Sequence, residues 1–184
     1  MRFVSFRQNG AQGIAVRVGD ELRGRIDNDP AYPGSLDDLI AAGSEALRSA
    51  AENLQAAPVV NEDGIEYAPL LACASKILCV GLNYHDHSAE SGFEQPTYPT
   101  LFARFNSSLI GHEMPIIRPR ISQALDYEGE LAVVIGRGGR HISKEDATSH
   151  VAGYSVFNDG SVRDYQHRTP QWTVGKNFDG TGAF

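Results

Sequence analysis

The chain has 184 residues, 41% of them hydrophobic and 21% charged, which is the composition of a soluble globular protein. Its net charge of −7 argues against non-specific binding to nucleic acids or anionic membranes. No apolar run reaches the roughly 18 residues of a transmembrane helix, and residues 1–10 lack the apolar core of a signal peptide. We therefore expect a cytoplasmic protein. Cys73 and Cys79 are predicted to be buried free thiols, as in a reducing compartment.

The first part of the chain predicts a small α+β domain over residues 1–72. Apolar residues alternate at its start, and a Gly-Asp pair at 19–20 indicates a hairpin turn between two strands. Ser35 and Asp38 have the spacing of a capping box, which marks the first turn of a helix. Leucines then recur with a helical period, so one helix is expected across residues 36–54. Nothing in this part indicates chemistry.

The second part, residues 73–184, predicts a β-rich unit, so the whole chain is expected to be a β-rich α+β protein. The expected strands are residues 76–83, 100–105, 126–136 and 151–157. A short helix is expected from Ser143, and Asn158-Asp159-Gly160 indicates a turn. Strands that outnumber helices in this way favour a barrel or a sandwich.

Three acids occupy alternate positions at the start of the strand predicted at 126–136. Asp126, Glu128 and Glu130 would share one face because side chains alternate along a strand. Clustered carboxylates attract a hard divalent cation, and Asp159 would supply a further oxygen ligand. The alternative is a strand edge whose acids face water.

A second group of polar residues lies between the first two strands expected in the second part. His87 and Glu90 are three residues apart, so one helical turn would place the carboxylate beside the imidazole and make a general base for water. A different interpretation is a zinc site on His85 and His87, which would need further ligands.

Two more segments carry charges suited to an anionic substrate. Arg163 and Gln166 follow the predicted turn, and Lys176 lies in a glycine-rich stretch where its ammonium could approach a substrate. Gly175-Lys176 is not a phosphate-binding loop, because the required glycine spacing and the following Ser or Thr are missing.

Taken in order, these motifs resemble the fumarylacetoacetate hydrolase family. The matching segments are residues 80–87, 126–136, 153–159, 163–166 and 175–178. The resemblance runs from about residue 76 to the C-terminus and implies a roll-like or barrel-like β catalytic domain. Family members continue beyond the position of Phe184, so the resemblance also implies that this domain is incomplete in the chain.

The resemblance implies a role for each matching polar residue. The implied metal is Mg²⁺ or Mn²⁺, with Ca²⁺ as a third choice, and its implied ligands are Glu128, Glu130 and Asp159. The implied catalytic residues are His87 and Glu90, which activate water, and Lys176, which contacts the substrate or its oxyanion. The implied substrate-binding residues are Arg104, Arg163, Gln166 and Tyr84. Many relatives have Lys-Pro where this chain has Arg104-Phe105.

The implied function is metal-dependent hydrolysis of a carbon–carbon bond in an acylpyruvate or another 1,3-diketo acid. Decarboxylation or enol–keto isomerisation of a 2-oxo acid in aromatic catabolism is an alternative on the same site, and an inactive fragment is another. The expected partners are the small-molecule substrate and a second copy of the chain, because relatives are usually homodimers.

Overall fold

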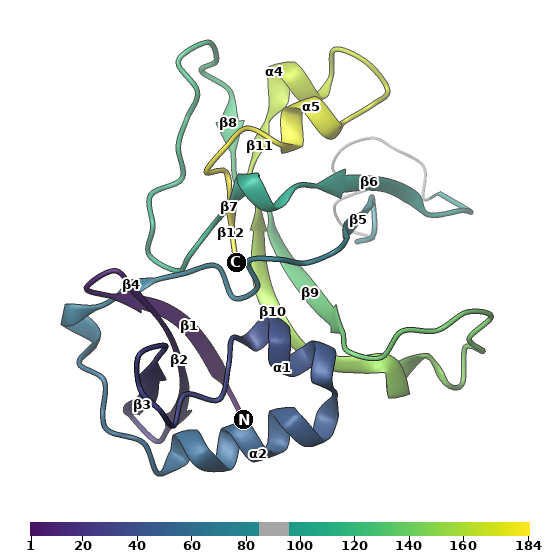
Figure 1. Ribbon diagram of the computed structural model, residues 1–184. Helices are drawn as coiled ribbons and strands as arrows, with labels where there is room; N and C mark the ends of the chain where they lie inside the picture. Colours follow the sequence, from purple (N-terminus) through teal and green to yellow (C-terminus); the bar gives the residue numbers. More distant parts are fainter. Residues whose placement is uncertain (85–95) are drawn as a thin grey trace.

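The computed structural model describes residues 1–84 and 96–184 and shows a mixed α/β protein, rich in sheet with few helices (Figure 1). Its strands form two four-stranded and two two-stranded sheets, and in the described residues none of them closes into a barrel. The four-stranded N-terminal sheet lies beside the sheets of the second part, and the C-terminus lies between them (Figure 1).

The N-terminal sheet has the strand order β3-β2-β1-β4, and each neighbouring pair is antiparallel. Its strands are β1 (Phe3–Gln8), β2 (Ala11–Val18), β3 (Glu21–Ile26) and β4 (Glu66–Tyr67). The hairpin predicted at 19–20 joins β2 to β3, which confirms the turn. A 3₁₀ helix, η1 (Glu62–Gly64), precedes β4.

Two helices cover one face of this sheet where the sequence predicted one. They are α1 (Leu36–Ala42) and α2 (Ser44–Gln55), and Ser35 and Asp38 form the predicted capping box. Gly43 separates the helices with a φ of 102°, a conformation that a residue with a Cβ rarely adopts. The break lets both helices bury their apolar faces against Ile14 and Val16 of β2.

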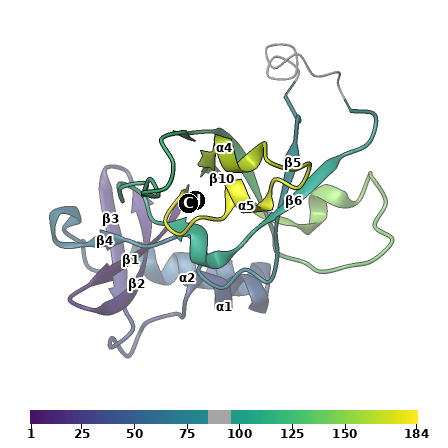
Figure 2. The same cartoon turned by 90° about the horizontal axis from the view of Figure 1, so that it is seen from above.

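The second part contains three sheets. Its main sheet has the order β7-β12-β10-β9, in which only the β7–β12 pair is parallel. The strands of that sheet are β7 (Leu109–Ile110), β9 (Gly129–Ile135), β10 (Val151–Asp159) and β12 (Gly182–Ala183). The two small sheets pair β5 (Ile77–Gly81) with β6 (Thr100–Arg104) and β8 (Leu125–Asp126) with β11 (Ser161–Val162). The short helices are η2 (Asn106–Ser108), η3 (Ala147–His150), α4 (Arg163–Gln166) and α5 (Thr173–Lys176), and Figure 2 shows α4 and α5 from above.

The acidic segment is not the single strand that the sequence predicted. It breaks at Tyr127-Glu128, between β8, which pairs with β11, and β9, which pairs with β10. At the break the backbone N–H of Glu128 donates to Asn158 Oδ1 at 3.0 Å, and the carbonyl of Glu128 accepts from the backbone N–H of Asp159 at 2.8 Å. The chain therefore turns from one sheet into the next at Glu128, and this corner is fixed against the end of β10.

Two other local predictions were wrong. The predicted turn at 158–160 is instead the end of β10, because Asn158 and Asp159 pair with β12. The helix expected from Ser143 is a turn followed by η3, although Ser143 Oγ does accept from the backbone N–H of Asp146 at 3.1 Å. The apolar runs thus located the strands but not their ends.

Continuous apolar runs predicted buried strands, but β5 and β9 each leave one face exposed. Leu131, Val133 and Ile135 of β9 are exposed on the same face, and Tyr154 and Val156 are exposed on β10. The predicted burial of the thiols is wrong for Cys73, which is exposed, while Cys79 is half-buried; both are free. A continuous run of apolar residues did not distinguish a strand that is buried on both faces from one that is buried on a single face.

The two parts of the chain share contacts. The backbone N–H of Leu70 donates to the carbonyl of Phe184 at 2.9 Å, and Phe184 packs with Val134 against the N-terminal core. The predicted division near residue 72 stays a prediction. Among the described residues, no helix is both long enough and apolar enough to cross a membrane.

Candidate functional site

Three charged side chains meet where β10 ends, and we call them the carboxylate–lysine cluster: Glu128, Asp159 and Lys176. Asp159 is the last residue of β10, Glu128 lies at the corner before β9, and Lys176 ends α5. Lys176 Nζ donates to Glu128 Oε2 at 2.7 Å and to Asp159 Oδ2 at 2.8 Å. One ammonium thus bridges two carboxylates that the sequence predicted to lie together.

Two arginines hold the other oxygen of each carboxylate. Arg104 donates to Asp159 Oδ1 at 2.5 Å, and Arg163 donates to Glu128 Oε1. All four oxygens of the two carboxylates therefore face a cationic donor. The side chains of Arg104, Asp159 and Lys176 are at most 3% exposed, so these charges are shielded from water. Charged pairs of this kind persist in a protein interior only when their hydrogen bonds are satisfied.

Arg104 ties several segments together behind Asp159. Besides Asp159, its guanidinium donates to the carbonyl of Gly160 at 3.0 Å, to Thr181 Oγ1 at 2.9 Å and to Ser108 Oγ at 3.3 Å. The resemblance implied a substrate contact for Arg104. Its place in the structure, with protein groups around a fully buried side chain, favours a role in positioning Asp159.

Arg163 connects the cluster to the other acids of the broken strand. Its Nε and Nη2 donate to Asp126 Oδ2 at 3.0 and 2.8 Å, and its Nη1 donates to Gln166 Oε1 at 2.9 Å. The Arg163 guanidinium lowers the pKa of Asp126. Asp126 therefore supports the arginine that holds Glu128.

The pKa values of the two glutamates shift in opposite directions. Burial would raise the pKa of Glu128, but the charges of Lys176 and Arg163 outweigh it and the pKa is lowered. The pKa of Glu130 is raised, first by burial and then by the charges of Glu128 and Asp159, against a hydrogen bond to Tyr84 that lowers it. Glu130 therefore lies within electrostatic reach of the cluster.

Tyr84, a predicted substrate-binding residue, lies beside the start of β9. Its hydroxyl accepts from the backbone N–H of Leu131 at 3.2 Å, and its side chain is hydrogen-bonded to Glu130. Tyr84 is the last residue described before the segment that carries the predicted dyad. His87 and Glu90, together with the alternative zinc ligand His85, lie outside the described residues.

The donor chemistry of the cluster suits a hard divalent cation. Glu128 and Asp159 each direct one oxygen to a shared point, where Lys176 Nζ sits, and carboxylate oxygens are the ligands that Mg²⁺, Mn²⁺ and Ca²⁺ prefer. Within residues 1–84 and 96–184, no three His, Cys, Asp or Glu side chains are gathered so as to hold a metal ion. The cluster therefore offers the type of ligand atom that such a cation prefers, but the Lys176 ammonium lies at the point where the two oxygens converge.

Two residues near Lys176, Asn177 and Phe102, have contacts that the sequence did not predict. Asn177 Oδ1 accepts a hydrogen bond from the backbone N–H of Phe105 at 2.7 Å, and Asn177 Nδ2 donates to the carbonyl of Ala103 at 2.9 Å. These bonds fix the end of α5 to β6. Phe102 places its ring centroid 5.0 Å from Lys176 Nζ. Asn177 belongs to the matching segment 175–178, whereas nothing in the sequence placed Phe102 beside Lys176.

The glycine before Lys176 has a packing reason. A Cβ on Gly175 would lie 2.4 Å from the backbone N of Gln166, so only glycine lets α5 approach α4 this closely. Gly175 thus lets α5 pack against Gln166 of α4, and the Gly-Lys pair at 175–176 does not form a phosphate-binding loop.

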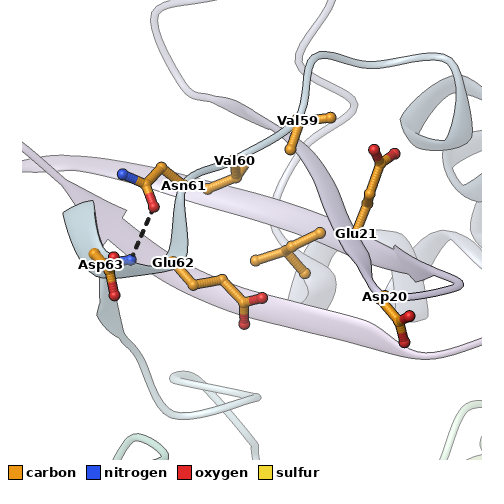
Figure 3. A pocket seen from close by; sticks show the side chains of 8 residues that line it. Asp20, Glu21, Val59, Val60, Asn61, Glu62 and Asp63 are labelled. Atoms are coloured by element: carbon orange, nitrogen blue, oxygen red, sulfur yellow. Dashed lines mark hydrogen bonds between the residues drawn. The ribbon is translucent and has the colours of Figure 1, made fainter.

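A hollow lined by described residues lies elsewhere, in the N-terminal part (Figure 3). It measures about 430 Å³, and several of its lining residues are acidic: Asp20, Glu21, Glu62 and Asp63. Glu62 forms an ion pair with Arg17, and Glu21 forms one with Arg23, so both carboxylates already have a cationic partner. This hollow lies away from the cluster, which is the better candidate for chemistry.

Comparison with known proteins gives consistent matches. A family model described as "Fumarylacetoacetate (FAA) hydrolase C-terminal" matches residues 76–184. The chain is 37% identical over 188 residues to a mitochondrial oxaloacetate tautomerase of Xenopus laevis, a match that covers 97% of this chain and 58% of the relative.

Two solved structures extend these matches to the fold. A fumarylacetoacetate hydrolase from Exiguobacterium antarcticum superposes with a TM-score of 0.80 at 33% identity, covering 99% of this chain and 64% of that one. A 5-carboxymethyl-2-hydroxymuconate delta-isomerase from Mycobacterium smegmatis gives 0.70 at 26% identity, covering 100% and 63%. The chain thus spans less than two thirds of the length of each of these proteins. It belongs to the fumarylacetoacetate hydrolase family.

Proposed function

We propose that the carboxylate–lysine cluster is the active site of an enzyme that converts a small 2-oxo acid through its enolate, and that the reaction is keto–enol tautomerisation. The observation that carries this proposal is the convergence of Glu128, Asp159 and Lys176 on one shielded point. An enolate develops negative charge on oxygen, and a pre-positioned ammonium stabilises such charge strongly where water is excluded.

The residues around this point have separable tasks. Lys176 would donate to the developing enolate oxygen, and Arg163, on the more exposed side, would contact the substrate carboxylate while keeping Glu128 in place. His87, oriented by Glu90, would move the proton. Tyr84 and Gln166 would complete the substrate contacts that the family resemblance implies.

A divalent cation belongs to this proposal. Enzymes of this family generally use a divalent metal, and we propose Mg²⁺ or Mn²⁺, with Ca²⁺ as a third choice, on Glu128, Glu130 and Asp159. Such a cation, when bound, supplies Lewis-acid polarisation of the 2-oxo group. Its open positions would accept a chelating pair of substrate oxygens, so we expect ion binding and substrate binding to be coupled.

Names of relatives support two reactions on this scaffold. The relative from Xenopus laevis is named an oxaloacetate tautomerase, and the structure from Mycobacterium smegmatis is named a delta-isomerase. Tautomerisation needs no activated water, so the described cluster supplies its main requirement. Carbon–carbon bond hydrolysis, the reaction first expected from the sequence, is the second candidate, because the His87–Glu90 spacing suits water activation and the Exiguobacterium structure is named a hydrolase.

One assay separates these reactions. Enolic oxaloacetate and a panel of acylpyruvates are offered to the protein with Mg²⁺ and again with EDTA. Tautomerisation predicts faster loss of the enol absorbance with no change in mass, hydrolysis predicts two organic acids, and decarboxylation predicts CO₂. An absence of turnover in the presence of Mg²⁺, with every substrate, would rule out the proposed function and favour the inactive-fragment alternative.

Assembly and location stay proposals as well. The exposed apolar side chains Leu131, Val133 and Ile135 on β9 support a homodimer, because such a row is usually covered by protein. Light scattering on the wild type and on Val133→Glu tests this, and a monomeric wild type would contradict it. A cytoplasmic location, checked by imaging a tagged protein, is proposed from the sequence alone, and the Xenopus relative is named mitochondrial.

A further inference from the structure

The four carboxylate oxygens of the cluster divide into two kinds. The outer oxygens, Asp159 Oδ1 and Glu128 Oε1, accept from Arg104 and Arg163. The inner oxygens, Asp159 Oδ2 and Glu128 Oε2, both accept from Lys176 Nζ, at 2.8 and 2.7 Å. The arginines therefore fix how each carboxylate is turned, and the lysine alone fills the point on which the inner oxygens converge.

Lys176 is held at this point by its surroundings. Its side chain is 2% exposed, and its ammonium lies 5.0 Å from the centroid of the Phe102 ring. Cations are attracted to an aromatic face at this distance. The inner oxygens are thus neutralised by a group of the chain itself, and the pair of carboxylates needs no added ion to be stable in the fold.

We propose that Lys176 is the resident counter-ion of Glu128 and Asp159 and competes with the divalent cation for their inner oxygens, so that the cation binds by exchange with the ammonium. This inference deepens the proposed function, on which it rests, by assigning Lys176 a role before substrate arrives. A divalent cation on these two oxygens would repel an ammonium at contact distance, so the two ions compete for the inner oxygens.

The outer contacts make the exchange local. Arg104 and Arg163 keep their oxygens while the inner contacts change partner, so both carboxylates stay oriented. The released ammonium stays on α5, which Asn177 fixes to β6, and becomes free to donate to an incoming anionic oxygen. Exchange therefore couples occupation of the carboxylates to the release of a substrate-binding cation.

Calorimetric titration with MnCl₂ tests the competition. Lys176→Met keeps most of the stem and removes the charge, so it should bind Mn²⁺ more tightly than the wild type by at least about tenfold, or about 1.4 kcal/mol. Lys176→Arg keeps a competing cation and should gain no affinity. Lys144→Met, the same change at an exposed position, should leave the affinity unchanged. Equal or weaker binding by folded Lys176→Met would overturn the proposal.

A measurement on the wild type covers the case in which Lys176→Met does not fold. Brief acetylation followed by peptide mass spectrometry should show Lys176 reacting several-fold faster with saturating Mn²⁺ than with EDTA, because its two acceptors have been taken. The exposed Lys76 and Lys144 should not change. An unchanged or slower reaction of Lys176 would refute exchange.

The outcomes separate this inference from the proposed function. Tighter Mn²⁺ binding by Lys176→Met with no turnover of any 2-oxo acid by the wild type would support exchange and refute the function. Metal-dependent turnover by the wild type with equal Mn²⁺ binding by both proteins would do the reverse. If neither protein binds Mn²⁺, both proposals are wrong.

Discussion

Arg104→Met should destabilise the protein far more than the same change at an exposed arginine. The Arg104 guanidinium is fully buried and pairs with Asp159 Oδ1 at 2.5 Å. It also donates to the carbonyl of Gly160 and to Thr181 Oγ1. Methionine fills most of the space of the arginine stem but donates to none of these groups.

The expected cost follows from the partners that remain. Asp159 keeps Lys176 on its inner oxygen, but its outer oxygen and the carbonyl of Gly160 lose a charged donor in a site shielded from water. Removing one partner of a buried ion pair costs about 3–5 kcal/mol. For a chain of this length, 1 kcal/mol shifts Tm by about 2–4 °C, so the expected fall is about 6–20 °C.

Urea unfolding followed by circular dichroism, in EDTA, measures this cost without a contribution from metal. Arg7→Met is the matched control, because Arg7 makes an exposed ion pair with Glu66 at 3.9 Å. Exposed pairs contribute about 0.2–1 kcal/mol. A difference between the two variants of less than about 1 kcal/mol would show that Arg104 does not anchor Asp159, and the reasoning from burial would fail.

Four further predictions concern the cluster, the residues implied by the family resemblance and the N-terminal part. Glu128→Gln should weaken Mn²⁺ binding by at least about a hundredfold in calorimetry, because a charged ligand is lost, and near wild-type affinity would contradict its role. His87→Ala should keep Mn²⁺ affinity and lower kcat at least about a hundredfold, whereas loss of metal would favour the zinc alternative. Gly43→Ala should lower the free energy of unfolding by about 1–3 kcal/mol, measured in urea, because φ is 102° there; no loss would mean that the backbone relaxes. Hydrogen bonds from Arg17 and Tyr67 lower the pKa of Glu62 from 4.5 to about 2. The ionised Glu62 therefore contributes to the free energy of unfolding fully above pH 4.5, and this contribution is lost as the pH falls toward 2. Arg17→Met should flatten the pH dependence of the free energy of unfolding in that window, and an unchanged slope would contradict this prediction.

Sequence patterns located most elements of this fold because burial and turn chemistry act locally. The Ser35–Asp38 capping box and the hairpin at 19–20 appear as predicted, since each depends on residues a few positions apart. The break at Gly43 was missed because a glycine only permits an interruption. The interruption is needed because α1 and α2 must run in different directions to pack against the same face of the N-terminal sheet.

The corner at Glu128 depends on long-range pairing and could not be predicted from its own neighbourhood. Alternating acids indicated one strand, but β8 and β9 pair with different strands, and the corner is held by Asn158, 30 residues further along the chain. The family motifs predicted that Glu128 and Asp159 would lie near Lys176. They did not predict that the ammonium would occupy the point shared by the carboxylates, because a motif records residue identity and not partner.

Because Lys176 already pairs with the carboxylates, a divalent cation would have to displace it in order to bind. In the described residues every buried side-chain nitrogen or oxygen has a hydrogen-bond partner, so the cluster is already satisfied without an added ion. With the exchange proposed above, the affinity that a titration measures for a cation is the difference between its contacts and those of Lys176. Since ligand stabilisation follows the observed affinity, a saturating cation should raise Tm less in the wild type than in Lys176→Met. Under the proposed exchange, the wild type gives up some metal affinity to keep a shielded pair of carboxylates folded and to hold an ammonium ready for a substrate.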